Sequence, residues 1–134
     1  MSRVWLSIVF VVVAVAAVTR PAEACSCVAQ TPAEIYERAD AAFVGDVVEV
    51  AEAARRKTVT VRVVRAYKGG VKDGETVTVT MPGGSSASCS LDLAAKARVV
   101  IFASATEGRL STNLCQGSYQ LEAGKPLPML PPPA

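Results

Sequence analysis

The pattern of hydrophobic and polar residues divides the chain into an apolar leader, a β-rich body and a proline-rich tail. Residues 4–18 form an almost unbroken apolar run behind a positively charged start, and the small-residue pattern Ala22-Glu23-Ala24 follows. This run is shorter than the ~20 residues of a membrane span, and it fits the core of a signal peptide with its cleavage site. We expect a signal peptide over residues 1–24, with an uncleaved membrane anchor as the alternative.

Beyond the leader, the pattern predicts one short helix and then a series of strands. Residues 31–34 (TPAE) have the composition of a capping box with proline at the first helical position, so a helix should begin here and end near Asp40. Apolar and polar residues then alternate, as in half-buried strands, and Gly45 predicts a bulge. The predicted strands cover residues 42–50, 58–67, 75–80 and 98–104, with a further short strand at 109–111.

Turn-forming residues separate these strands. Residues 51–57 (AEAARRK) predict a charged turn or hairpin tip, and residues 68–74 predict a glycine-rich connection. Residues 81–89 (MPGGSSASC) are predicted as a loop that a cysteine holds at one end, and Glu107-Gly108 as a turn. The body is therefore all-β apart from its N-terminal helix.

Four or five short strands with one capped helix predict a small closed or nearly closed β-barrel. A five-stranded barrel of the OB type fits the length, and a β-sandwich is the alternative because periodicity does not distinguish the two. We expect a single domain over residues 25–123, followed by a proline-rich, disordered tail over residues 124–134.

All four cysteines, Cys25, Cys27, Cys89 and Cys115, lie beyond the predicted cleavage site. An even number of cysteines in an exported chain implies a disulfide framework. A bond between Cys25 and Cys27 would close a very tight ring, so geometry favours the two pairings that join them to the distant cysteines. A four-thiolate zinc site is the other use of these residues, but its usual paired CxxC spacing is absent.

Composition excludes most catalytic sites. The chain has no histidine, which excludes Ser-His-Asp and Cys-His catalysis and histidine metal sites. Carboxylates such as Asp46, Glu49 and Asp92 are scattered, and we expect them to be solvated. With 14 basic and 12 acidic residues the chain is nearly neutral, so its charge points to neither a nucleic acid nor an anionic membrane. We expect a binding protein without a cofactor of its own, and not an enzyme.

Cleavage after Ala24 would make Cys25 the first residue and would free its α-amine. An α-amine has a pKa of about 7.7–8.0, so a fraction is neutral near neutral pH and can bind a metal. Together with the Cys25 carbonyl oxygen it would form a five-membered chelate. Disulfides at Cys25 and Cys27 would stiffen this segment and reduce the ordering cost on binding.

The segment Cys25-Ser26-Cys27-Val28 at a mature N-terminus resembles the tissue inhibitors of metalloproteinases, in which a netrin-like domain forms an OB barrel. Residues 42–45 (AFVG) look like the first strand of that family. Residues 63–69 (VVRAYKG) are similar to the netrin-module pattern that ends in a Tyr-Lys-Gly turn. Cys89 and Cys115 fall where the family places the partners of its first two cysteines.

This resemblance spans residues 25–123 and is to a single-domain homologue of the bacterial type. It implies the disulfides Cys25–Cys89 and Cys27–Cys115, and it implies that Cys25 chelates the catalytic zinc of a target protease through its amine and carbonyl. Only four cysteines are present, so the third disulfide of the family's domain is missing. The implied contacts with the protease cleft are Ser26, Cys27, Val28, Ser85, Ser86, Ala87 and Ser88.

The implied function is that of a secreted, monomeric inhibitor of zinc metalloendopeptidases, placed outside the cell or in the cell envelope or periplasm. The zinc belongs to the partner, and no nucleic acid or membrane partner is expected. Two alternatives remain. The chain is an extracellular netrin-like binding module in which the disulfides only stabilise the barrel, or it is a lipoprotein anchored at Cys25, although Ala22 and Glu23 suit a lipidation signal poorly.

An intact-mass measurement on exported protein distinguishes these alternatives. We expect the mass of residues 25–134 less four hydrogen atoms, because cleavage after Ala24 and two disulfides account for the whole change. An added acyl mass would support the lipoprotein instead, and a different first residue would contradict the chelating N-terminus.

Overall fold

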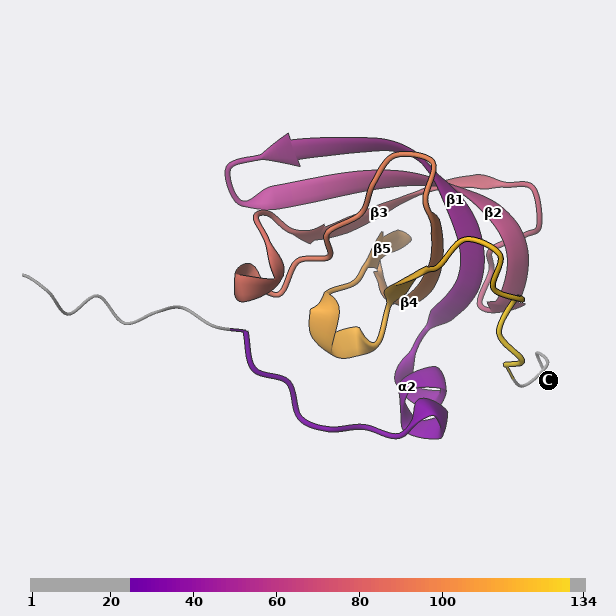
Figure 1. Ribbon diagram of the computed structural model, residues 1–134. Helices are drawn as coiled ribbons and strands as arrows, with labels where there is room; N and C mark the ends of the chain where they lie inside the picture. Colours follow the sequence, from indigo (N-terminus) through magenta and orange to yellow (C-terminus); the bar gives the residue numbers. More distant parts are fainter. Residues whose placement is uncertain (1–24, 131–134) are drawn as a thin grey trace, which may run out of the picture.

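The computed structural model describes residues 25–130, so the predicted signal peptide (1–24) and the last part of the tail (131–134) lie outside the described residues. Within residues 25–130 the structure is mostly β, with one short α-helix (Figure 1). The elements are α2 (Pro32–Arg38), β1 (Ala41–Ala53), β2 (Arg56–Lys68), β3 (Thr76–Pro82), the 3-10 helix η1 (Ser86–Ser88), β4 (Arg98–Thr106), β5 (Arg109–Ser111), the 3-10 helix η2 (Leu114–Gln116) and β6 (Tyr119–Leu121).

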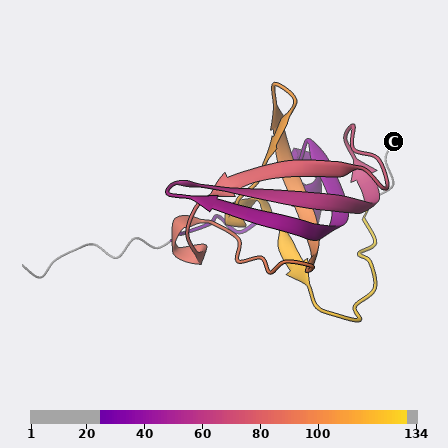
Figure 2. The same cartoon turned by 90° about the horizontal axis from the view of Figure 1, so that it is seen from above.

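Five strands close into a barrel. They are hydrogen-bonded in the order β1-β2-β3-β5-β4, and β4 pairs in turn with β1. Every pair is antiparallel except β3 with β5. An extra strand, β6, adds to β4, and the β1–β2 hairpin extends past the rest of the barrel (Figure 2). The predicted five-stranded barrel is confirmed, and the β-sandwich alternative is wrong.

Alternating residues of the strands fill the barrel, as the sequence period requires. Gly45 lies where β1 changes register against β2, as expected for a bulge. A side chain at Gly45 would meet the carbonyl oxygen of Arg62 at 2.7 Å, so only glycine permits this close approach of the strands. The buried side chains that fill it include Phe43, Val47, Val59, Val61, Val63, Val79, Val99 and Ile101.

A second apolar cluster lies on the outside of β1 and β4, beneath α2. Ile35 and Tyr36 of the helix pack against it from one side. Leu127 and Leu130 of the tail pack against it too, and the Tyr67 hydroxyl donates a hydrogen bond to the Pro128 carbonyl at 2.8 Å. The described part of the tail therefore has no regular secondary structure but contacts the barrel, which the sequence did not indicate.

The helix begins as predicted. The Glu34 amide donates to the Thr31 hydroxyl and the Thr31 amide donates to the Glu34 carboxylate, which completes the capping box. The predicted turn at residues 51–57 is shorter in the structure, because β1 and β2 continue to Ala53 and from Arg56. Residues 51–56 are all exposed, so their charged side chains do not interrupt strand pairing there.

Asp46 is not simply solvated. It lies opposite Arg98 in the β1–β4 pairing, and the two side chains form an ion pair with a Nε–Oδ1 distance of 2.9 Å. The hydrogen bond from Arg98 lowers the pKa of the Asp46 carboxyl below its usual value. Both side chains remain more than two-fifths exposed, so solvent screens the interaction.

This ion pair gives the stability a defined dependence on pH. Because the pKa of Asp46 is lower in the folded state, its contribution is complete above the unfolded value and is lost as the pH falls through the folded value. Asp46→Asn should lower the free energy of unfolding at neutral pH by less than about 1 kcal/mol and should flatten its fall in acid. Urea unfolding measured between neutral and acid pH tests this, with Glu49→Gln as the control. An unchanged acid profile would contradict the assignment.

Candidate functional site

The residues that follow the predicted cleavage site form an extended segment that runs along one side of the barrel towards α2 (Figure 1). We call residues 25–28 the N-terminal tip. Cys25 is half-buried, whereas Ser26 and Cys27 are exposed. The Val28 side chain is 84% exposed, although it is apolar. The tip therefore exposes a polar side chain, Ser26, and an apolar one, Val28.

Two disulfides hold the tip against the barrel. Cys25 is bonded to Cys89 and Cys27 to Cys115, across 64 and 88 residues of sequence. This is the pairing that the family resemblance implied, and no cysteine among the described residues is free. The four sulfurs are thus used in bonds to one another and do not form a four-thiolate zinc site. Two disulfides fit an extracellular or otherwise oxidising compartment.

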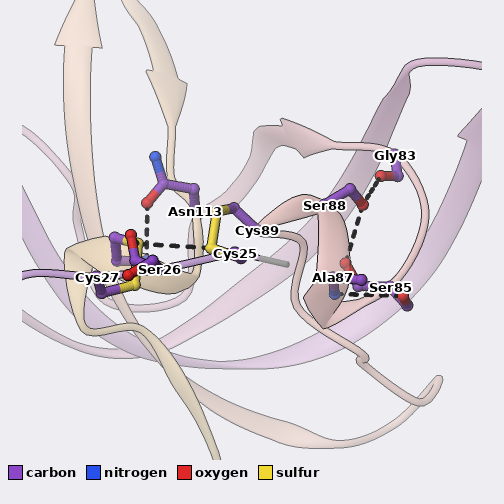
Figure 3. Close-up of a disulfide and its surroundings, with 10 residues drawn as sticks. Cys25, Ser26, Cys27, Gly83, Ser85, Ala87, Ser88, Cys89 and Asn113 are labelled. Carbon is purple, nitrogen blue, oxygen red and sulfur yellow. Dashed lines mark hydrogen bonds between the residues drawn. A yellow bond between two sulfur atoms is a disulfide. The ribbon is translucent and has the colours of Figure 1, made fainter. Parts of the chain in front are cut away.

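The two disulfides lie in contact. The sulfur of Cys25 is 3.7 Å from that of Cys115, and the sulfurs of Cys25, Cys27 and Cys115 all lie within 4.8 Å of one another (Figure 3). Because neither sulfur of an oxidised pair carries a proton, the contact between them is one of packing. The tip is consequently fixed at two neighbouring points and has little freedom to rotate.

Cys89 lies on a loop with its own internal hydrogen bonds, which we call the serine loop (residues 83–91). The Ser88 hydroxyl donates to the carbonyls of Gly83 and Ser85 at 2.6 and 2.9 Å, and the Ala87 amide donates to the Ser85 hydroxyl (Figure 3). Cys89 ends η1 in the left-handed conformation, with φ of 63°. The loop that the sequence predicted over residues 81–89 thus contains a turn with its own internal hydrogen bonds.

Cys115 lies on a second loop (residues 112–118), which buried hydroxyls attach to β4. The Thr112 hydroxyl donates to the Phe102 carbonyl at 2.7 Å, and the Phe102 amide donates to the Ser118 hydroxyl at 2.8 Å. Both hydroxyl-bearing residues are buried. The Leu114 amide donates to the Cys89 carbonyl at 2.8 Å, which joins the second loop to the serine loop.

The structure brings the predicted site residues together. Ser26, Cys27 and Val28 of the tip are exposed, and so are Ser85, Ser86, Ala87 and Ser88 of the serine loop, which the Cys25–Cys89 bond links to the tip. No residue of 25–29 or 83–90 has an ionisable side chain once the cysteines are oxidised. A freed amine on Cys25 would therefore be the one titratable group within these two segments.

Sequence reasoning missed the residues that support the serine loop from the β1–β2 hairpin. The Glu52 carboxylate accepts a hydrogen bond from the Gly84 amide at 2.8 Å, and the Gly83 amide donates to the Arg55 carbonyl at 3.2 Å. Lys57 is buried, and its ammonium donates a hydrogen bond to the Gly84 carbonyl of this loop at 3.0 Å. One signal was present: Lys57 occupies the same alternating row of β2 as Val59 and Val61, where an apolar residue is expected.

Comparison with known proteins does not add a family assignment. No protein-family model matches the chain, and no curated protein matches it. Within residues 25–130, no helix is both long and apolar enough to cross a membrane. Conclusions on function must therefore rest on the geometry of the tip and its two loops.

Removal of either disulfide should destabilise the barrel by a similar amount. Both bonds close long loops, so restriction of the unfolded chain by each bond should contribute about 4 kcal/mol to the free energy of unfolding. We expect this loss in each of the double variants Cys25→Ser/Cys89→Ser and Cys27→Ser/Cys115→Ser. Equilibrium urea unfolding measures the loss, and Ser26→Ala provides a control on the exposed tip. A loss below about 1 kcal/mol for either pair would show that the bond does not constrain the unfolded chain as expected.

Proposed function

We propose that this chain, after removal of its leader before Cys25, is a secreted inhibitor of zinc metalloendopeptidases. The observation that carries the proposal is the double covalent attachment of Cys25 and Cys27 to two loops of the barrel, while Ser26 and Val28 remain exposed. A bond network this dense around a short exposed segment suits a segment that must enter another protein without changing shape.

The chemistry follows from what a cleaved Cys25 would offer. A catalytic zinc site keeps one coordination position open for water or substrate. The neutral α-amine and the carbonyl oxygen of Cys25 are two ligands on one residue, and together they would displace the water from that position and bind as a chelate, with the zinc expanding its coordination to accept both. The zinc is the partner's, and this chain contributes ligands without holding a metal of its own.

The neighbouring residues would extend the contact along the protease cleft. Ser26 would direct its short side chain towards the specificity pocket beside the zinc, and Cys27 and Val28 would follow the substrate groove. The serine loop, with Ser85–Ser88, would lie along the other side of the cleft. Because the disulfides already restrict this segment, little conformational entropy would be lost on binding, which favours affinity.

Export is part of the proposal, since the two disulfides require only an oxidising compartment. The alternative is a netrin-like binding module that uses the outer faces of the barrel strands, with or without a lipid on Cys25. The two functions differ in one respect that can be measured. Inhibition through a chelate requires a free amine at Cys25, whereas binding through the barrel does not.

The chain beginning at Cys25 should inhibit at least one member of a panel of zinc endopeptidases. An added alanine before Cys25 should weaken that inhibition by a factor on the order of a hundred or more, because an amide nitrogen is a poor zinc ligand and the extra residue collides with the cleft. Rates of peptide hydrolysis give the inhibition constant, and chemical acetylation of the amine should act like the extension.

The extended protein should unfold at the same urea concentration as the protein that begins at Cys25, because residue 24 lies outside the two disulfides. Inhibition that survives both extension and acetylation would contradict the chelate. Absence of inhibition across the panel, together with ligand capture that the extension leaves intact, would favour the binding module.

A further inference from the structure

Lys57 is a buried lysine that the proposed chelate does not use. It is 4% exposed and lies in the inward row of β2, in line with Val59 and Val61, which are fully buried. Burial of an ammonium group is costly unless hydrogen bonds replace its water. A buried lysine therefore needs hydrogen-bond acceptors that offset this cost, and the acceptors of Lys57 indicate what it holds in place.

Both partners of Lys57 lie on the serine loop. Its ammonium donates to the carbonyl of Gly84 at 3.0 Å and to the carbonyl of Leu91 at 2.9 Å. These two carbonyls lie at opposite ends of the loop, on either side of Cys89. One side chain from the barrel wall thus fixes the separation of the two loop ends and the height of the loop above the barrel.

Glu52 completes the attachment. It lies directly opposite Lys57 in the β1–β2 pairing. Its carboxylate accepts from the amide of Gly84, while Lys57 donates to the carbonyl of the same residue. Gly84 has φ of +89°, and a side chain there would meet the Ser88 hydroxyl at 2.6 Å. The cross-strand pair consequently binds both polar backbone groups of one glycine that no other residue replaces without strain.

The serine loop connects Lys57 to Cys25, so the position of the loop determines the position of Cys25. The internal hydrogen bonds of the loop, which the Ala87 amide and the Ser88 hydroxyl donate to Ser85, tie its residues to one another. Cys89 is bonded to Cys25, and their α-carbons are 5.1 Å apart. A shift of the loop relative to β2 would therefore carry Cys25 with it. A displacement near 1 Å is enough to cost a large factor where ligand geometry is strict.

We propose that Lys57 is a positioning residue for inhibition, which sets the place of Cys25 by holding both ends of the serine loop against β2. This inference rests on the proposed function. Lys57 would touch neither the protease nor its zinc, and it would act through Gly84, Leu91 and the Cys25–Cys89 bond.

The test compares two lysines of β2 whose ammonium groups each donate to two backbone carbonyls, one of them buried (Lys57) and the other half-buried (Lys68). Lys57→Met keeps the length of the side chain and removes the donors. Lys68 provides the matched control, because its ammonium also donates to two carbonyls, those of Tyr36 and Glu37, both at 3.0 Å, but at the end of α2. Lys68→Met should therefore lose a similar number of hydrogen bonds without releasing the serine loop.

Lys57→Met should raise the inhibition constant by a factor on the order of ten to a hundred and should speed amide hydrogen exchange within residues 84–91. Lys68→Met should lower stability but leave the inhibition constant within about threefold. Lys57→Arg, which retains the charge and the donors, should restore most of the inhibition. If Lys57→Met does not fold, Glu52→Gln weakens the same attachment and should raise the constant by about threefold or more.

Equal loss of inhibition in Lys57→Met and Lys68→Met would reduce Lys57 to a general stabilising residue and overturn the inference. Unchanged inhibition by a folded Lys57→Met, or by Glu52→Gln where Lys57→Met does not fold, would overturn it as well. Failure of the proposed function looks different, because the unaltered protein would then inhibit no protease. In that case the claim about inhibition falls with it, and hydrogen exchange still measures whether Lys57 holds the loop.

Discussion

The covalent attachment of residues 25 and 27 to the barrel is the constraint on which the rest of the site depends. An extended segment of this kind, with no strand partner, would otherwise sample many conformations. Bonds from Cys25 to Cys89 and from Cys27 to Cys115 place it between two loops, and the Leu114–Cys89 hydrogen bond joins those loops to each other. The exposed tip is thereby held rigidly against the barrel.

The barrel supplies that rigidity in layers. Strands β1 to β5 close on one another, so the core residues Phe43, Val61 and Ile101 have no open edge beside them. Polar side chains then attach the two loops to this core. Buried Lys57 and exposed Glu52 bond the serine loop, and the buried hydroxyls of Thr112 and Ser118 bond the second loop to β4. Three buried polar side chains, Lys57, Thr112 and Ser118, therefore lie where a loop is held in place.

Local patterns predicted most of the fold. Alternation identified β2 and β3, the capping box identified α2, and Gly45 identified the bulge in β1. Strand β6 was missed because three residues show no period, and the docking of the tail was missed because proline-rich composition says nothing of a partner such as Tyr67. The pairing of the cysteines came from the family resemblance, since spacing left two choices. The hydrogen bonds of Lys57 to the serine loop could not be predicted from the sequence, because its partners lie about 30 residues away along the chain.

The absence of ionisable side chains from the tip and from the serine loop bears on how a partner would be approached. Charged interfaces speed encounter through long-range attraction, and salt weakens them. A surface of hydroxyls, disulfides and one valine offers no such attraction. Selection among targets would then depend on the fit of short-range contacts after collision, and the rate of collision would be largely indifferent to the ionic strength of the surroundings.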